Sequence, residues 1–202
     1  RARRFAALAG VAIGVAFMAK YAAVYFLIGV ALAALRREGR IGWGNAGLLL
    51  LAFAVVISPN IVWNLTHQLT TFSHTADNVG WVRQDNPLAA LHPMGAAEFL
   101  LSQFAVVGPV VFGALLIGLW KPGRGAGLWP FIVPPLAVVT LQALLGEAQA
   151  NWAVAAFFAG SLLAVAVLAG HRRWITASFV VNGAIAVIMP LLVIFTDISP
   201  DG

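Results

Sequence analysis

The sequence predicts an all-α protein, a polytopic bundle of about seven transmembrane segments that forms a single domain over residues 1–202. Composition is the first observation: 61% of the residues are hydrophobic and only 9% are charged, whereas a soluble domain carries about 25% charged residues. The second observation is a series of apolar runs of about the 20 residues that a helix needs to cross a bilayer. The third is that Lys and Arg gather between these runs, as topology signals do.

The first apolar stretch, residues 5–35, is too long for one crossing. Its 31 residues would form a helix of about 46 Å, whereas the hydrocarbon core is about 30 Å thick. Arginine clusters flank it on both sides, at positions 1, 3 and 4 and at positions 36, 37 and 40. If both clusters are cytoplasmic, the stretch folds into a hairpin of two short helical arms with Lys20 at its outer tip.

Five later segments follow from the remaining apolar runs. We expect them at residues 44–62, 96–120, 128–145, 152–169 and 175–195, all helical because lipid leaves no backbone group unpaired. Small residues on the segments allow helices to approach closely, and the glycines expected to do so are Gly10, Gly14, Gly108 and Gly113.

Alternation of these segments predicts the membrane orientation. With the N-terminus inside and the C-terminus outside, ten of the twelve Lys and Arg residues fall inside, all except Lys20 and Arg83. Six of the seven acidic residues fall outside, and Glu38 falls inside. Any chemistry is therefore expected at the outer face, which carries the long polar segment 63–95 and the short connection 146–152.

The segment 63–95 concentrates side chains that suit sugar binding. Amides and carboxylates form hydrogen bonds with hydroxyls, and indole rings stack on pyranose faces. The candidate residues here are Trp63, Asn64, His74, Asp77 and Asn78, and the connection adds Asn151 and Trp152. The same mixture also suits an interfacial aromatic belt with a helix cap, and spacing does not separate the two interpretations.

Lys20 and Tyr21 form a second candidate group. A lysine between two apolar arms is costly inside the membrane but stable at the interface, where its ammonium can meet a phosphate. The alternative is that Lys20 is an interfacial anchor, with Tyr21 and Tyr25 as part of the aromatic belt. Arg83 is either another phosphate ligand or a solvated loop arginine.

Several other classes of function are not supported by the sequence. The chain has no cysteine, and its four histidines are too scattered to predict a metal cluster. No basic patch is interleaved with aromatic residues, so we expect no nucleic-acid partner. The sequence identifies no cofactor and leaves a divalent metal open.

Five short strings give the chain a resemblance to a known family. They are FMAKYAAVY (17–25), SPNIVWN (58–64), TFSHTADN (71–78), EFLLSQF (98–104) and ANWA (150–153). In this order and spacing they resemble the bacterial glycosyltransferase family 39 proteins of the GT-C superfamily, which includes protein mannosyltransferases and lipid A aminoarabinose transferases. The resemblance covers about residues 10–195 and concerns only the later helices of such enzymes.

The resemblance implies transfer of a sugar from a polyprenyl-phosphate donor to a hydroxyl of a lipid or glycan acceptor, at the outer face of a bacterial inner membrane. It implies that the donor or acceptor is held by Lys20, Tyr21, Trp63, Asn64, His74, Asp77, Asn78, Asn151 and Trp152. The catalytic base of such enzymes lies in an earlier outer loop that this chain does not match, so we expect the chain alone to be inactive. Glu147 departs from the family, because a basic residue is expected before the ANWA string.

Two other functions stay open. A transporter or lipid-sugar flippase would carry charged residues or broken helices at mid-membrane and an internal repeat. The sequence shows no such repeat. A structural or assembly subunit of a membrane complex is the third possibility.

Overall fold

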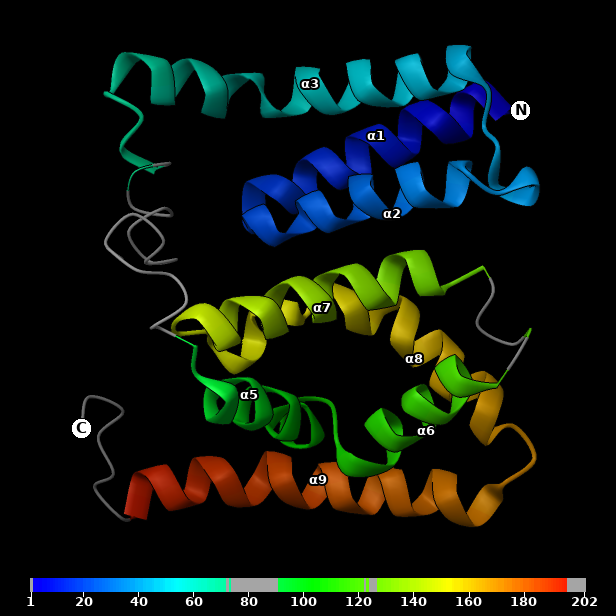
Figure 1. Cartoon of the computed structure of the whole chain (residues 1–202), viewed down its shortest axis with the longest axis vertical. Helices are drawn as coiled ribbons and strands as arrows, with labels where there is room; N and C mark the ends of the chain where they lie inside the picture. The colour runs from blue at the N-terminus through cyan, green and yellow to red at the C-terminus, as the bar shows by residue number, and fades with distance from the viewer. Residues whose placement is uncertain (1, 72, 74–90, 122, 124–126, 196–202) are drawn as a thin grey trace.

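The computed structural model describes residues 2–71, 73, 91–121, 123 and 127–195. This part of the chain is all helical: eight α-helices and short 3₁₀ turns, with no strand among the described residues (Figure 1). The predicted all-α membrane bundle is therefore confirmed.

The first two helices form the predicted hairpin. Helix α1 (Ala2–Ala19) runs antiparallel to α2 (Val24–Ala34), and Lys20 with the 3₁₀ turn Tyr21–Ala23 joins them (Figure 1). Lys20 ends α1 because its backbone is extended, with φ −155° and ψ 124°. The two arms have different neighbours: α1 packs mainly on α3, and α2 packs mainly on α7.

Helix α3 (Trp43–Thr66) approaches α1 closely because two glycines of α1 face it. A Cβ at Gly10 would overlap the backbone carbonyl of Leu49. A Cβ at Gly14 would lie 2.8 Å from Cβ of Val56. This is the small-residue packing of membrane helices, in which missing side chains let backbones meet. The sequence prediction for these two glycines is confirmed.

The segment expected at residues 96–120 is not one continuous helix. It is divided into α5 (Pro93–Val106) and α6 (Pro109–Trp120), which are bent by 115°. Gly108 lies at the break with φ +91°, a backbone conformation that favours glycine. Pro109 then begins α6, where its missing N–H costs nothing.

The break is held by the last helix. The side-chain amide of Asn182 donates to the carbonyl oxygen of Val107 at 3.4 Å, and a Cβ at Gly108 would overlap the Asn182 side chain. Gly108 therefore permits a close approach, as predicted. Gly113 does not, because a Cβ there would meet nothing within 4 Å.

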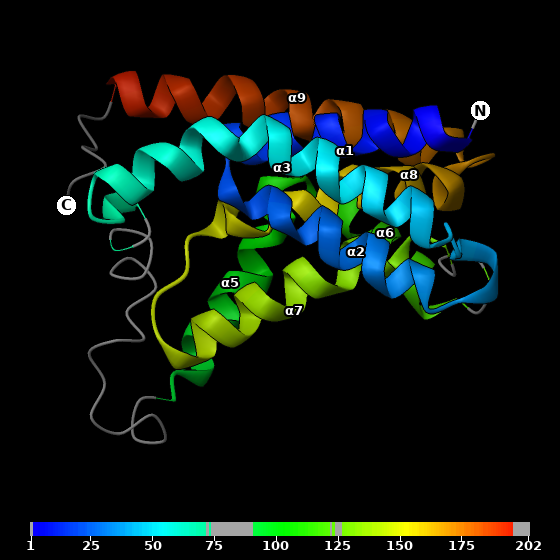
Figure 2. The ribbon, with the colours of Figure 1, turned by 90° about the horizontal axis from the view of Figure 1, so that it is seen from above.

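The main core lies among α6, α7 (Trp129–Leu145) and α8 (Ala155–Leu168). Leu115, Ile132 and Leu163 are fully buried there, one from each of these helices. Helix α9 (Arg172–Phe195) lies at the edge of the bundle and carries no buried residue (Figure 1). Figure 2 shows α5 and α7 inclined away from α3 and α9.

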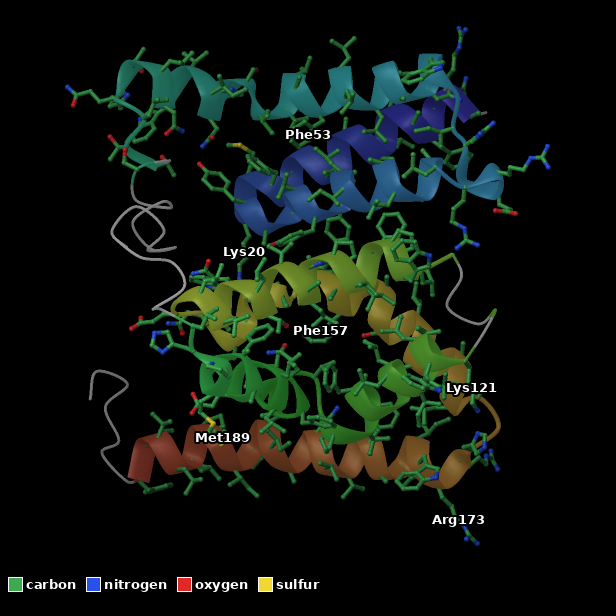
Figure 3. All side chains as sticks on the ribbon, in the orientation of Figure 1. Lys20, Phe53, Lys121, Phe157, Arg173 and Met189 are labelled. Atoms are coloured by element: carbon green, nitrogen blue, oxygen red, sulfur yellow. The ribbon has the colours of Figure 1, made fainter. Side chains whose placement is uncertain are left out.

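Three described helices, α1, α3 and α9, are long and apolar enough to span a membrane, or four spans result if the bent pair α5–α6 counts as one. Three shorter apolar helices, residues 21–34, α7 and α8, complete the set. The count of seven segments and their orientation thus stay predictions. Figure 3 shows Lys121 and Arg173 at one end of the bundle and Lys20 nearer the other end.

The close contact between α1 and α3 predicts a stability effect. Replacing Gly10 with Ala adds a Cβ that overlaps the Leu49 carbonyl, so we expect the free energy of unfolding to fall by about 1–3 kcal/mol. Gly113→Ala is the matched control, and we expect it to leave stability unchanged or raise it by up to about 1 kcal/mol. Thermal unfolding in detergent measures both, and equal melting temperatures for the two variants would contradict the packing.

Candidate functional site

Lys20 lies beside the connection between α7 and α8. Its Nζ donates to the backbone carbonyl oxygen of Asn151 at 3.2 Å, which joins two positions 131 residues apart. Both side chains are exposed. The hairpin turn and the 3₁₀ turn Ala150–Ala153 therefore meet at one end of the bundle.

The Lys20 ammonium brings a positive charge to this end. Among the described residues no carboxylate lies within ion-pair distance of Lys20. The ion pair found in this part of the chain joins Arg36 to Glu38, in the turn between α2 and α3. An ammonium has three N–H donors, so the bond to Asn151 leaves donors that a ligand anion can accept from. The exposed tip of Lys20 can therefore donate hydrogen bonds to an anion.

Tyr21 is held in place from two sides. Its ring stacks on Phe17 at a centroid distance of 4.7 Å, and its hydroxyl lies 3.2 Å from Oδ1 and 3.1 Å from Nδ2 of Asn60. Asn60 belongs to α3 and in turn receives a hydrogen bond from Asn64, whose Nδ2 lies 2.9 Å from the Asn60 carbonyl oxygen. The hairpin turn is thereby connected to the end of α3.

Asn64 is fully buried and holds the chain where it leaves α3. Its Oδ1 accepts from the backbone N–H of Thr71 at 3.2 Å, and its carbonyl oxygen accepts from the N–H of Leu69 at 2.8 Å. The backbone turns here through Gln68 and Leu69, both with φ 55°. Both ends of the Asn64 side-chain amide thus form hydrogen bonds within the protein.

Trp63 offers an aromatic surface at the same helix end. Its ring stacks on His67 at 4.3 Å between centroids with an interplanar angle of 10°, and it is 46% exposed. The Nδ1 of His67 lies 2.8 Å from the Trp63 carbonyl oxygen, which fixes the pair. Trp152, by contrast, is partly buried and packs against the apolar cluster that contains Phe99 and Val139.

Two buried glutamines hold the connection that Lys20 contacts. Gln103 of α5 donates from Nε2 to the carbonyl oxygen of Ala150 at 3.1 Å. Gln142 of α7 donates from Nε2 to the carbonyl oxygen of Glu147 at 3.0 Å. The connection is therefore fixed through its backbone by two helices.

The structure brings together some of the residues predicted from sequence. Lys20, Tyr21 and Asn151 lie at the meeting of the hairpin and the connection, and Trp63 and Asn64 lie at the end of α3. The predicted site residues His74, Asp77 and Asn78, and the alternative phosphate ligand Arg83, lie outside the described residues. Their roles, like all the assigned ligand contacts, stay predictions.

The sequence strings include Asn60 and Gln103, but sequence reasoning gave neither a defined role, and it did not single out Gln142. The signal that could have found them is an amide side chain inside an otherwise apolar run, which is costly in a membrane unless it is paired. Among the described residues, no three His, Cys, Asp or Glu side chains lie close enough together to hold a metal ion.

An all-helical bundle with spanning apolar helices and a polar, hydrogen-bonded end defines a polytopic membrane protein. The chain is similar to lipid A galacturonosyltransferase RgtD of Rhizobium johnstonii, with 34% identity over 197 residues. The alignment covers 92% of this chain but 40% of the length of that protein. No protein-family profile and no solved structure matches the chain, so the resemblance to family 39 stays a prediction.

The buried position of Asn64 predicts a stability effect. Asn64→Ala removes the side-chain hydrogen bonds to the Thr71 N–H and to the Asn60 carbonyl oxygen, so we expect unfolding to become easier by about 1–3 kcal/mol. Ser58→Ala on the same helix removes an exposed hydroxyl and is expected to change stability by no more than about 0.5 kcal/mol. Thermal unfolding in detergent compares the two, and an Asn64→Ala protein as stable as the control would contradict the described network.

Proposed function

We propose that this chain forms the later helices of a bacterial membrane glycosyltransferase. The enzyme transfers a sugar from a polyprenyl-phosphate donor to a hydroxyl of a lipid acceptor, at the outer face of the inner membrane. The similarity to a lipid A galacturonosyltransferase over 92% of this chain supports the class of reaction. The observation that carries the site assignment is the exposed Lys20 ammonium held by the Asn151 carbonyl.

The proposed transfer needs two things from the protein: a base for the acceptor proton and a positive charge near the leaving phosphate. The acceptor oxygen forms a bond to the anomeric carbon, the bond from that carbon to the phosphate oxygen breaks, and the phosphate leaves with the electron pair. A base takes the acceptor proton. Lys20 would stabilise the negative charge on the departing phosphate, which is where a fixed positive charge lowers the barrier. We assign the base to a part of the enzyme that this chain does not match.

The sugar would lie between the hairpin turn and the end of α3. The exposed face of Trp63 suits stacking on a pyranose ring, and the exposed Asn151 side chain suits hydrogen bonds with its hydroxyls. Galacturonic acid is the first sugar to test and lipid A the first acceptor, because the relative is named for both. Tyr21, Asn64 and Trp152 would act mainly by holding these groups in place, as their contacts indicate.

The flippase alternative has one supporting feature, the break between α5 and α6, because broken helices are typical of transporters. A second feature of transporters, a charged residue in the middle of a span, is missing from α1, α3 and α9, because these helices carry no charged residue beyond their first turn. Purified full-length protein in liposomes separates the two proposals. Transfer of sugar from the donor lipid to the acceptor lipid supports the transferase. Movement of the donor lipid across the bilayer without sugar transfer supports the flippase.

Removing the Lys20 ammonium tests the site assignment. In the full-length enzyme, we expect Lys20→Ala to lower kcat/KM for the polyprenyl-phosphate donor by roughly 10- to 100-fold, because a hydrogen bond to a charged group contributes about 1.5–3 kcal/mol. Lys20→Arg keeps the charge and should recover part of the loss. The control Lys121→Ala, at the opposite end of the bundle, should keep the wild-type value. Unchanged donor kinetics in a folded Lys20→Ala protein would remove Lys20 from the site.

The proposed orientation can be tested by cysteine labelling, because the chain contains no cysteine of its own. Gln149→Cys lies on the connection beside Lys20, and Glu38→Cys lies in the turn between α2 and α3; both positions are exposed. We expect an impermeant maleimide to label position 149 in intact spheroplasts and position 38 only after permeabilisation. The reverse pattern would contradict an outer-face site.

A further inference from the structure

Two consecutive carbonyl groups of the connection between α7 and α8 are each held by a side chain from elsewhere in the fold. The carbonyl oxygen of Ala150 accepts from Gln103 at 3.1 Å, and the next carbonyl oxygen, of Asn151, accepts from Lys20 at 3.2 Å. The bond from Gln103 fixes the 3₁₀ turn in which both carbonyls lie. The position of the Lys20 ammonium is therefore linked to a buried amide on α5.

The surroundings of Gln103 determine which way its amide points. Its Nε2 lies 2.9 Å from the Phe99 carbonyl oxygen, 3.1 Å from Oγ of Ser102 and 3.1 Å from the Ala150 carbonyl oxygen. The Ser102 hydroxyl already donates to the Phe99 carbonyl oxygen, so all three neighbours present acceptors to the two N–H groups of the amide. A flipped amide would turn its oxygen toward two carbonyl oxygens, which is unfavourable. Gln103 therefore acts as a donor to the connection.

This arrangement has an energetic cost. Gln103 is fully buried, and its Oε1 has no hydrogen-bond partner among the described residues. A buried acceptor without a partner destabilises the fold, and an apolar side chain of the same shape would avoid that cost. Its donor contacts, and the bond to Ala150 in particular, are what the amide contributes at this position.

Gln142 holds the same connection from the other side. It is buried in α7, and its Nε2 donates to the carbonyl oxygen of Glu147 at 3.0 Å. The two glutamines thus fix the backbone at positions 147 and 150, on either side of the exposed residue Gln149. Lys20 contacts the connection at the Asn151 carbonyl, one residue after the Ala150 carbonyl that Gln103 holds.

We propose that Gln103 and Gln142 are positioning residues that orient the Lys20 ammonium through the backbone of residues 147–151. The proposal rests on the proposed function, in which Lys20 meets the donor phosphate. Neither glutamine touches the donor. Each acts by keeping the Asn151 carbonyl where it holds Lys20, so loss of either amide lets the ammonium move away from the phosphate.

The test uses the full-length protein with Gln103→Met and Gln142→Met, which keep the apolar part of the side chain and remove the donor. Asn182→Leu is the matched control, because it removes an amide-to-carbonyl hydrogen bond at the break between α5 and α6. The probe is a short-chain polyprenyl phosphate bearing galacturonic acid, with lipid A as acceptor. We expect each glutamine variant to raise the donor KM by roughly tenfold, the effect of losing one hydrogen bond. We expect kcat to change less, and the control to keep the wild-type donor KM.

A double variant separates positioning from general stabilisation. If Gln103 acts through Lys20, adding Gln103→Met to Lys20→Ala should lower kcat/KM for the donor little further. Losses that multiply would overturn the proposal, because the two residues would then act independently. A donor KM that is unchanged in folded Gln103→Met and Gln142→Met proteins would overturn it as well.

Hydrogen exchange keeps this test independent of catalysis. We expect the backbone amides of residues 147–153 to exchange at least tenfold faster in Gln103→Met than in wild type, and at the wild-type rate in Asn182→Leu. If the wild-type enzyme transfers no sugar but this change is seen, the proposed function fails and the anchoring role stands. If sugar is transferred and exchange is unchanged, the positioning role fails alone. Should Gln103→Met not fold, Gln103→Asn, whose shorter amide cannot reach Ala150, gives the same comparison.

Discussion

Backbone N–H and C=O groups in a membrane protein must find partners inside the protein, and several side chains meet this need at the polar end of the bundle. The Lys20 ammonium, the amides of Gln103 and Gln142 and the side chain of Asn64 all form hydrogen bonds with main-chain groups. These bonds fix the non-helical backbone at the ends of the helices. Because the backbone of the connection is fixed in this way, the Asn151 carbonyl can hold the exposed Lys20 ammonium in one position.

The hairpin places that charge. Because α1 packs on α3 through Gly10 and Gly14 while α2 packs on α7, the turn that carries Lys20 lies between two parts of the bundle. From there Lys20 reaches the connection after α7, and Tyr21 reaches Asn60 of α3. The close helix packing therefore places the turn from which the candidate site is built.

The sequence predicted the helical class and the hairpin because both follow from apolar length and from the arginine clusters. It did not predict the bend at Gly108 and Pro109, since a hydropathy run does not record backbone geometry, although the dipeptide itself was a signal. Gly113 was wrongly expected at a close contact, because spacing alone does not say which face of a helix meets a neighbour. The anchoring by Gln103 and Gln142 needed the structure, since their partners are backbone carbonyls in a distant segment.

The central claim is that the Lys20 end of the bundle meets the phosphate of a polyprenyl lipid. The most direct measurement is photo-crosslinking of the full-length protein with a polyprenyl phosphate that carries a diazirine next to the phosphate, followed by peptide mapping. We expect crosslinks in residues 17–25 or 147–153 and competition by unlabelled polyprenyl phosphate. Crosslinks confined to the arginine-rich end, at residues 36–40 or 171–174, would contradict the account.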